Sequence, residues 1–162
     1  MIYGVTKVTA ANTAQNNPDK TIIRVTNGFV YRVYLFFPFG PAGLLHAQIF
    51  DGSYQVWPST IGDSFHVEGS VIDFEDCYFK MTPPYEFKLV TWNLDDTLEH
   101  EVQVKIGMVS QDIYIARFLP SYAYNQLSEI LSKQEQEKRE IDEQAKSEIL
   151  EKPINWKLSK KG

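Results

Sequence analysis

Short runs of alternating or continuous apolar residues, separated by turn-forming residues, fill the first 118 positions of the chain. Runs of this kind that are rich in β-branched and aromatic side chains predict β-strands. We expect strands at 21–25, 29–37, 44–50, 54–57, 64–67, 70–74, 77–81, 85–93 and 99–109. About eight short strands joined by turns are typical of a mainly β fold. The pattern therefore predicts an antiparallel β-sandwich, with a jelly-roll-like topology.

Strand pairing and facing can be predicted for several of these segments. Asp51-Gly52 separates 44–50 from 54–57 and predicts a tight hairpin. Segments 85–93 and 99–109 are expected to pair across the acidic turn 94–97. Alternation predicts that one face of the last strand is buried, through Val102, Val104, Ile106 and Met108.

Segment 29–37 is apolar on both faces, one of which is formed by Phe29, Tyr31, Val33, Leu35 and Phe37. A strand of this kind is either central in a sandwich or covered by a partner subunit.

The pattern changes after residue 118. Segment 112–118 is expected to be a connector, and Pro120-Ser121 signals a helix start. Residues 122–151 contain no Gly or Pro and consist largely of strong helix formers, so a long helix is predicted. The side of this helix that could form a coiled-coil contact is apolar at both ends and polar in the middle. A coiled coil that is stable by itself has apolar residues along the whole contact. We therefore expect the helix to dock at each end, and Pro153 to end it.

Charge divides the chain in the same way. Residues 1–118, the predicted β-sandwich domain, carry −5; residues 119–151, the predicted helix, carry −4; and residues 152–162 form a basic tail of +4 that is expected to be extended. The overall charge of −5 argues against a dedicated nucleic-acid-binding protein, and no apolar run is long enough to cross a membrane. The single Cys excludes an internal disulfide.

No nucleophile elbow, phosphate-binding loop or paired acid–base motif is present, so we predict neither an enzyme nor a cofactor. The acidic groups Asp73, Glu75 and Asp76 could bind calcium, but ordinary strand-end and turn acids explain them better. The histidines at 46, 66 and 100 are scattered without zinc-ligand spacing. We therefore predict no metal site.

Apolar residues in unusual places are candidates for an interface. The loop 36–45 contains large apolar side chains among prolines and glycines, and it either caps the sandwich or meets another subunit. The tail is either a docking arm or a frayed end. The candidate interface residues in the loop, the helix and the tail are Phe36, Phe37, Phe39, Leu44, Leu45, Leu127, Leu131, Ile149, Ile154, Trp156 and Leu158.

Three aromatic residues could instead bind a ligand. Tyr54, Trp57 and Trp92 could form a platform on which sugar rings stack, with nearby Asn and Asp side chains binding hydroxyl groups. Aromatic residues in a sandwich of this size also serve simply as core. Exposed, coplanar rings would favour the ligand-binding alternative.

Three motifs resemble a pattern in small uncharacterised β-sandwich proteins of tailed phages and viral metagenomes. They are Phe37-Pro38-x-Gly40-x-x-Gly43-Leu44-Leu45-His46, Ile49-x-Asp51-Gly52-x-x-Gln55-Val56-Trp57-Pro58-Ser59 and Trp92-Asn93-x-Asp95-Asp96-Thr97-x-x-His100. The similarity spans about 29–109 and transfers no catalytic or binding residue.

The resemblance implies a viral setting. We expect a virion protein, present in the host cytoplasm during assembly, whose partners are further copies of itself or the major capsid, portal or tail proteins. The alternative is a glycan-binding module of a host-recognition structure.

Overall fold

The structure, a computed structural model, describes residues 1–151, so the predicted tail lies outside the described residues. In α2 it also leaves out the side chains of residue 142 and residues 145–151. The strands are β1 (Ile2–Thr9), β2 (Asp19–Arg24), β3 (Gly28–Phe37), β4 (Leu45–Asp51), β5 (Tyr54–Trp57), β6 (Ser70–Lys80), β7 (Glu86–Asn93) and β8 (His100–Val109). The helices are α1 (Gln111–Phe118) and α2 (Pro120–Glu151).

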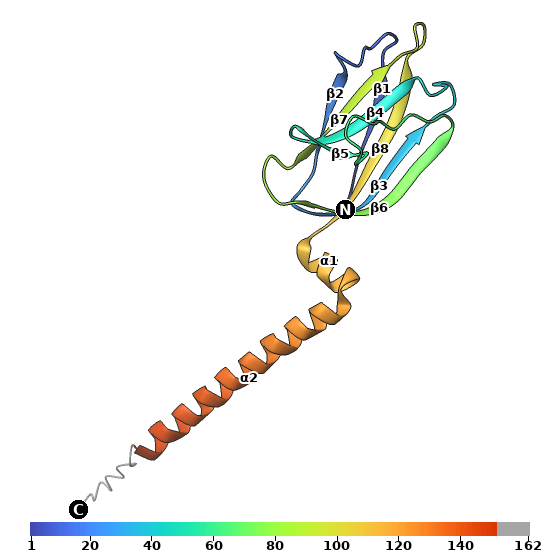
Figure 1. The fold of residues 1–162 in the computed structure, drawn as a ribbon. Coiled ribbons are helices and arrows are strands. Elements are labelled where there is room, and N and C mark those ends of the chain that lie inside the picture. Colours follow the sequence, from blue (N-terminus) through green and yellow to red (C-terminus); the bar gives the residue numbers. More distant parts are fainter. Residues whose placement is uncertain (152–162) are drawn as a thin grey trace, which may run out of the picture. The chain divides into compact units, whose positions relative to one another are not determined.

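The eight strands of the described residues form two four-stranded antiparallel sheets (Figure 1). One sheet has the order β1-β8-β3-β6 and the other has the order β2-β7-β4-β5. Consecutive strands alternate between the two sheets except at the β4–β5 hairpin, and this alternation is the strand arrangement of a jelly roll. The predicted mainly β sandwich followed by a long helix is confirmed.

The core lies between the two sheets and is filled from both. The predicted buried face of β8 is confirmed, since Val102, Val104, Ile106 and Met108 have no exposed surface. The largest side chains of the core are Trp57, Phe37 and Phe87. Within the described part of the chain, every buried side-chain nitrogen and oxygen atom has a hydrogen-bond partner. The described residues of the sandwich therefore fill the core and satisfy its buried polar groups by themselves.

Strand β3 is central, between β8 and β6, which explains why it is apolar on both faces. Its predicted facing is partly wrong, because a bulge shifts the register between Val30 and Arg32. The extra residue turns Val30 inward and leaves Phe29 and Tyr31 partly exposed.

The predicted hairpin between 85–93 and 99–109 is wrong, because β7 and β8 belong to different sheets. The loop between them is organised by Asp95, whose Oδ1 accepts hydrogen bonds from the backbone N–H groups of Thr97 and Leu98 at 2.8 and 3.0 Å. The Asn93 amide donates to Leu98 and to Thr9 on β1, in the opposite sheet. These bonds direct the chain across the sandwich instead of back along the same sheet.

Several other predicted segments differ from the strands and helices that the structure shows. Segments 70–74 and 77–81 form one continuous strand, β6, and β1 was not predicted at all. Segment 64–67 is not a strand, since only Phe65 bridges Ala47 of β4. The segment expected to be a connector forms α1 instead.

The chain divides into two units, Met1–Tyr114 and Ile115–Gly162. The division falls four residues before the boundary expected at residue 118 and lies inside α1. In the first unit, Tyr114 stacks on Phe29 at 4.2 Å, and Phe29 stacks on Phe79 of β6 at 4.0 Å. The second unit contains α2, whose start at Pro120 agrees with the predicted start signal. None of the described helices is long and apolar enough to span a membrane.

Candidate functional site

The loop 38–44 brings some predicted interface residues to the surface and buries others. Phe37 and Leu45, at the ends of β3 and β4, have no exposed surface and belong to the core, so the prediction that they form an interface is wrong. Phe36 faces outward from β3 and is half-buried, because alternate residues of a strand point to opposite faces. Phe39 is 85% exposed and Leu44 is 37% exposed.

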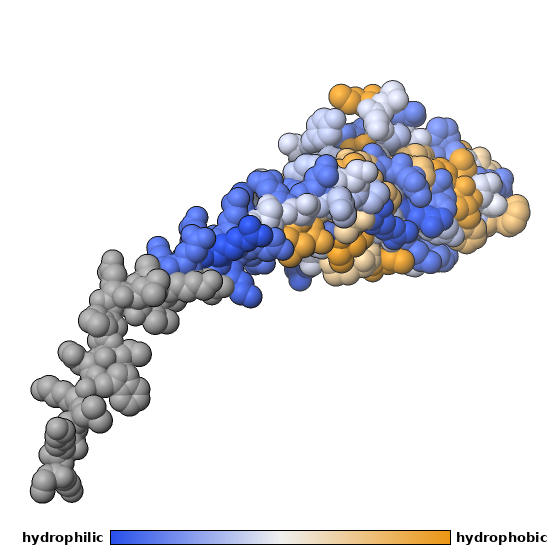
Figure 2. Space-filling model, turned by 90° about the horizontal axis from the view of Figure 1, so that it is seen from below, coloured by the Kyte–Doolittle hydropathy of each residue, from blue (hydrophilic) through white to orange (hydrophobic). Residues whose placement is uncertain are grey.

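An apolar surface forms where this loop meets the β7–β8 loop. The backbone N–H of Leu94 donates to the carbonyl oxygen of Leu44 at 3.0 Å, which joins the two loops. Leu94 exposes 53% of its surface beside Leu44, and Leu98, further along the β7–β8 loop, exposes 60%. Figure 2 shows hydrophobic residues at several places on the surface of the sandwich.

Helix α2 leaves its predicted interface residues uncovered. Leu127 and Leu131 expose 56% and 51% of their surfaces, and no side chain described for α2 is buried. The other predicted positions give no structural information, since the side chain of Ile149 and the residues Ile154, Trp156 and Leu158 lie outside the described part.

The predicted aromatic platform is not formed. Trp57 is 1% exposed, and its Nε1–H donates to Asp76 at 2.6 Å. Trp92 is 4% exposed and stacks on His46 at 4.9 Å between ring centres. Tyr54 alone of the three is exposed, at 60%. The two tryptophans therefore cannot offer open ring faces to a sugar.

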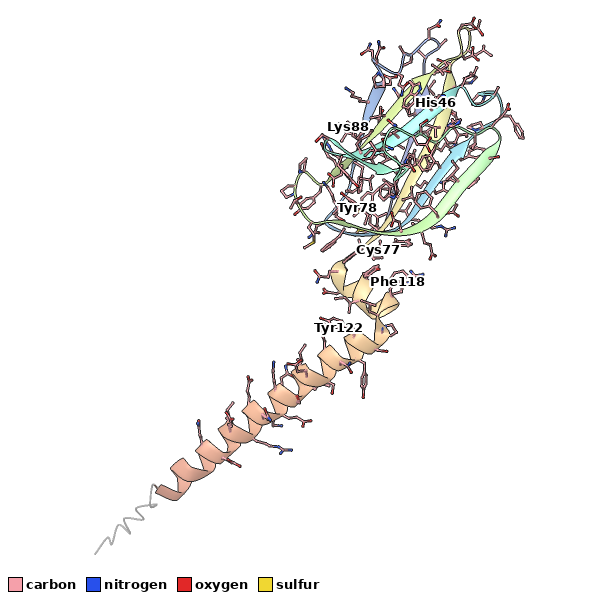
Figure 3. All side chains as sticks on the ribbon, viewed as in Figure 1. His46, Cys77, Tyr78, Lys88, Phe118 and Tyr122 are labelled. Atoms are coloured by element: carbon pink, nitrogen blue, oxygen red, sulfur yellow. The ribbon has the colours of Figure 1, made fainter. Side chains whose placement is uncertain are left out.

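A groove of about 500 Å³ lies instead on the outer face of the β2-β7-β4-β5 sheet. Its residues come from strands β2, β4, β5 and β7, from the segment before β2, from the β4–β5 turn and from the loop after β5; they are Gln15, Pro18, Lys20, Gln48, Phe50, Ser53, Gln55, Ile61, Gly62, Lys88, Val90 and Trp92. Figure 3 labels Lys88 of β7, and also His46 of β4, whose ring covers one face of Trp92.

Two glutamines organise one side of the groove. The Gln48 amide donates to the carbonyl oxygen of Asp63 at 2.7 Å and to Gln55 Oε1 at 3.3 Å. The Gln55 amide donates to the carbonyl oxygens of Pro58, Thr60 and Asp63. These bonds hold the loop 58–63 against the sheet and give the groove a fixed wall.

The groove is not predicted from the sequence, although the outer face of β4 carries a signal for it. In β4 the polar residues His46 and Gln48 alternate with the buried residues Ala47 and Ile49, which places them on the outer face. That pattern describes one strand, whereas the groove depends on the neighbours of β4 in the sheet. Strand order is what brings Lys20 and Lys88 into the same groove as Gln48.

The opposite outer face, on the β1-β8-β3-β6 sheet, has a smaller depression of about 250 Å³. It lies around Gly107, which leaves room for the Tyr31 ring because it has no side chain. Lys105 lies over the Tyr34 ring at 5.2 Å.

Two of the three acidic residues considered for calcium binding, Asp73 and Asp76, have other partners. Asp73 forms a bidentate ion pair with Arg32, and this contact holds the pKa of the Asp73 carboxyl below its usual range. Asp76 accepts hydrogen bonds from Trp57 and from the backbone N–H of Cys77. Among residues 1–151 no three His, Cys, Asp or Glu side chains converge as a metal site would require.

The three histidines do not converge. His46 and His66 lie 4.8 Å apart between ring centres, and Ser64 Oγ is 2.8 Å from His46 Nδ1. Burial, followed by the nearby charge of His66, lowers the pKa of His46. His100 instead bonds to Asp95 in the β7–β8 loop at 2.9 Å. Backbone N–H donors from Thr97 and Leu98, together with His100, hold the pKa of Asp95 far below its usual range.

One buried ion pair lies near the β4–β5 turn. Lys80 is 2% exposed, and its ammonium is 2.5 Å from Asp51. Tyr78 donates to the second oxygen of Asp51 at 2.9 Å. Burial and this carboxylate raise the pKa of Tyr78 to about 12.

No protein family, curated protein or solved structure matches this chain.

Proposed function

We propose that this protein is a non-enzymatic structural component of a tailed virus particle, as capsid decoration, connector or tail component, and that α2 makes its main contacts with neighbouring subunits. The observation that carries the proposal is the exposure of α2. Leu127, Leu131 and Ile141 each expose more than half of their surface, and no described side chain of the helix is buried. Most helices in proteins owe their stability to packing of an apolar face, so this one is expected to pack against another chain.

The apolar end of the sandwich gives further support. Phe39, Leu94 and Leu98 expose 85%, 53% and 60% of their surfaces, although the core of the sandwich is complete without them. Leu44 and Leu94 lie side by side through a backbone hydrogen bond, and adjoining exposed apolar groups commonly mark a contact surface. The jelly roll is a frequent architecture of capsid proteins, but lectins and cupins share it, so the fold adds an analogy only.

The test compares two double variants of the full chain by size-exclusion chromatography with light scattering. Leu127→Glu with Leu131→Glu places two charges on the exposed apolar residues, and we expect it to lower the molar mass of the assembly. Ser128→Glu with Ser132→Glu adds the same charges at the same spacing, about 100° around the helix, and should leave the mass unchanged.

A chain that is monomeric at all concentrations, or equal loss of mass in both double variants, would contradict the proposed role of α2. Mass spectrometry of purified particles of the encoding virus tests the viral setting separately, and absence of the chain from those particles would refute it.

A further inference from the structure

The groove on the outer face of the β2-β7-β4-β5 sheet has the chemistry of a binding site. We propose that it binds an acidic saccharide, a sugar that carries a carboxylate or sulfate group. This inference does not depend on the assembly role, because the groove belongs to the sandwich alone.

The first argument is charge. Lys20 and Lys88 both line the groove, and none of the described residues that line it is acidic. The Lys20 ammonium has no ion-pair or hydrogen-bond partner within residues 1–151, and the Lys88 ammonium donates only to the carbonyl oxygen of Gly52, at 2.7 Å. The rest of the sandwich is rich in carboxylates, so two uncompensated ammonium groups in one concave place favour an anionic ligand.

The second argument is a nearly buried polar side chain with spare hydrogen-bonding capacity. Gln48 is 8% exposed, and its Nε2 is occupied by Asp63 and Gln55. Its Oε1 has no protein donor among the described residues, yet it is not closed off from solvent. A hydroxyl group can donate to this oxygen, so Gln48 supplies the acceptor that the two lysines lack.

The third argument is the presence of apolar surface beside these polar groups. Phe50, which is half-buried, lies on the outer face two residues from Gln48 along β4, and Val90, which pairs with Gln48, is 6% exposed there. The Lys88 ammonium lies 5.4 Å from the centre of the Phe50 ring. The C–H faces of a sugar ring fit such a surface while its hydroxyl groups reach the amide and the ammonium groups.

The groove is also formed in advance. Its outer wall, the loop 58–63, is fixed by the Gln55 amide, and Gln55 Oε1 accepts the backbone N–H of Gly62 at 3.1 Å. A ligand that enters this groove does not have to order the wall, which lowers the entropic cost of binding.

A saccharide fits this place better than an acidic peptide. Extended peptides commonly bind by adding a strand to a sheet edge, where backbone N–H and C=O groups are free. The groove instead lies on a sheet face, over β7 and β4, whose backbone groups are engaged with strands on both sides. The groups available for recognition are therefore side chains.

The test uses isothermal titration calorimetry of the full chain with trigalacturonate and sialyllactose as acidic sugars and lactose as the neutral counterpart. We expect at least one acidic sugar to bind and lactose to bind much more weakly. Lys20→Gln with Lys88→Gln should weaken acidic-sugar binding by at least about tenfold, because it replaces two charge-assisted hydrogen bonds with neutral ones.

The matched control is Lys105→Gln, which removes a cation from the opposite outer face and should leave the affinity unchanged. A Gln48→Leu variant removes the acceptor together with the amide that holds the loop 58–63, and it should weaken binding while circular dichroism shows a folded sandwich. The proposal is overturned by absence of binding to both acidic sugars at millimolar concentration, by equal affinity for lactose, or by an equal effect of Lys105→Gln. Equally tight binding of a glutamate oligopeptide would overturn the saccharide assignment.

Discussion

Lys80 and Asp51 form a buried ion pair, and breaking it should lower the free energy of unfolding. The Lys80 side chain is 2% exposed, whereas Asp51 is 21% exposed and also accepts from Tyr78. Lys80→Met leaves this carboxylate without its cation, and removing one partner of a fully buried pair costs roughly 3–5 kcal/mol. Because Asp51 retains solvent contact and the Tyr78 hydrogen bond, we expect a loss of about 2 kcal/mol by urea denaturation.

The control for this prediction is a more exposed lysine–aspartate pair in the same sandwich. Lys7 lies 3.0 Å from Asp19, with side-chain exposures of 24% and 45%. Lys7→Met should cost less than about 1 kcal/mol. Equal losses of unfolding free energy in the two variants would show that burial of Lys80 does not increase the contribution of its ion pair to stability.

His46 should make the stability of the sandwich depend on pH. Its pKa is lowered from the model-peptide value of 6.5 by burial and by His66, so the folded state binds its proton less readily than the unfolded state does. Stability should therefore be full above pH 6.5 and decrease as the pH falls from 6.5 towards the lower pKa of the folded state. The groups that face His46 are the His66 and Trp92 rings and the Ser64 hydroxyl.

Thermal unfolding at pH 7.5 and pH 5.5 measures this effect. His46→Gln retains a polar group that can reach Ser64 but does not titrate, so its melting temperature should fall less on acidification than that of the parent chain. If the variant keeps the full dependence on pH, other groups cause it.

At the scale of elements, the sequence predicts which segments are strands better than it predicts their partners. Alternation along β8 identifies its buried face, because burial of alternate residues is a local property. Sheet membership is not local: the loop that Asp95 organises sends the chain to the other sheet, although its length also suits a hairpin. The bulge in β3 is likewise invisible in its apolar pattern, because residues on both faces of this central strand are apolar.

The start of β3 depends on a glycine at position 28. Gly28 has φ = 143°, and a Cβ placed there would lie 2.3 Å from the carbonyl oxygen of Val109 at the end of β8. Gly28→Ala therefore strains the backbone and also pushes β3 from β8, with an expected loss of about 3 kcal/mol. Gly43, with φ = 78° and open space around its Cα, is the matched position, and Gly43→Ala should cost about 1 kcal/mol. Urea denaturation measures both, and similar losses would mean that the β8 backbone moves aside freely.

At the scale of the whole molecule, the candidate surfaces differ in whether their residues come from one segment of the sequence or from several, and this decides whether the sequence reveals them. The apolar residues of α2 could be identified as interface candidates because every position of a solvated helix is visible in its sequence pattern. Phe37 and Leu45 could not be separated from Phe39 and Leu44, because only the fold decides which members of one apolar loop enter the core. The groove needed four strands in a known order, and for that reason no sequence motif marks it.

The last prediction concerns the basic tail. Residues 153–162 carry three lysines together with Ile154, Trp156 and Leu158, and they lie outside the described residues. The core of the unit Met1–Tyr114 is filled by its own residues. Deleting 153–162 should therefore leave the melting temperature of the sandwich unchanged, while lowering the molar mass of the assembly measured by light scattering.

A second tail variant separates charge from apolar contact. Changing Ile154, Trp156 and Leu158 to Ser keeps the length and the lysines, so it should reduce assembly as much as the deletion if the apolar groups make the contact. If only the deletion reduces assembly, the lysines act through long-range attraction, and that effect should disappear at high salt. A drop in the melting temperature of the sandwich with either variant would instead show that the tail packs on the sandwich itself, and the prediction that the tail serves assembly would fail.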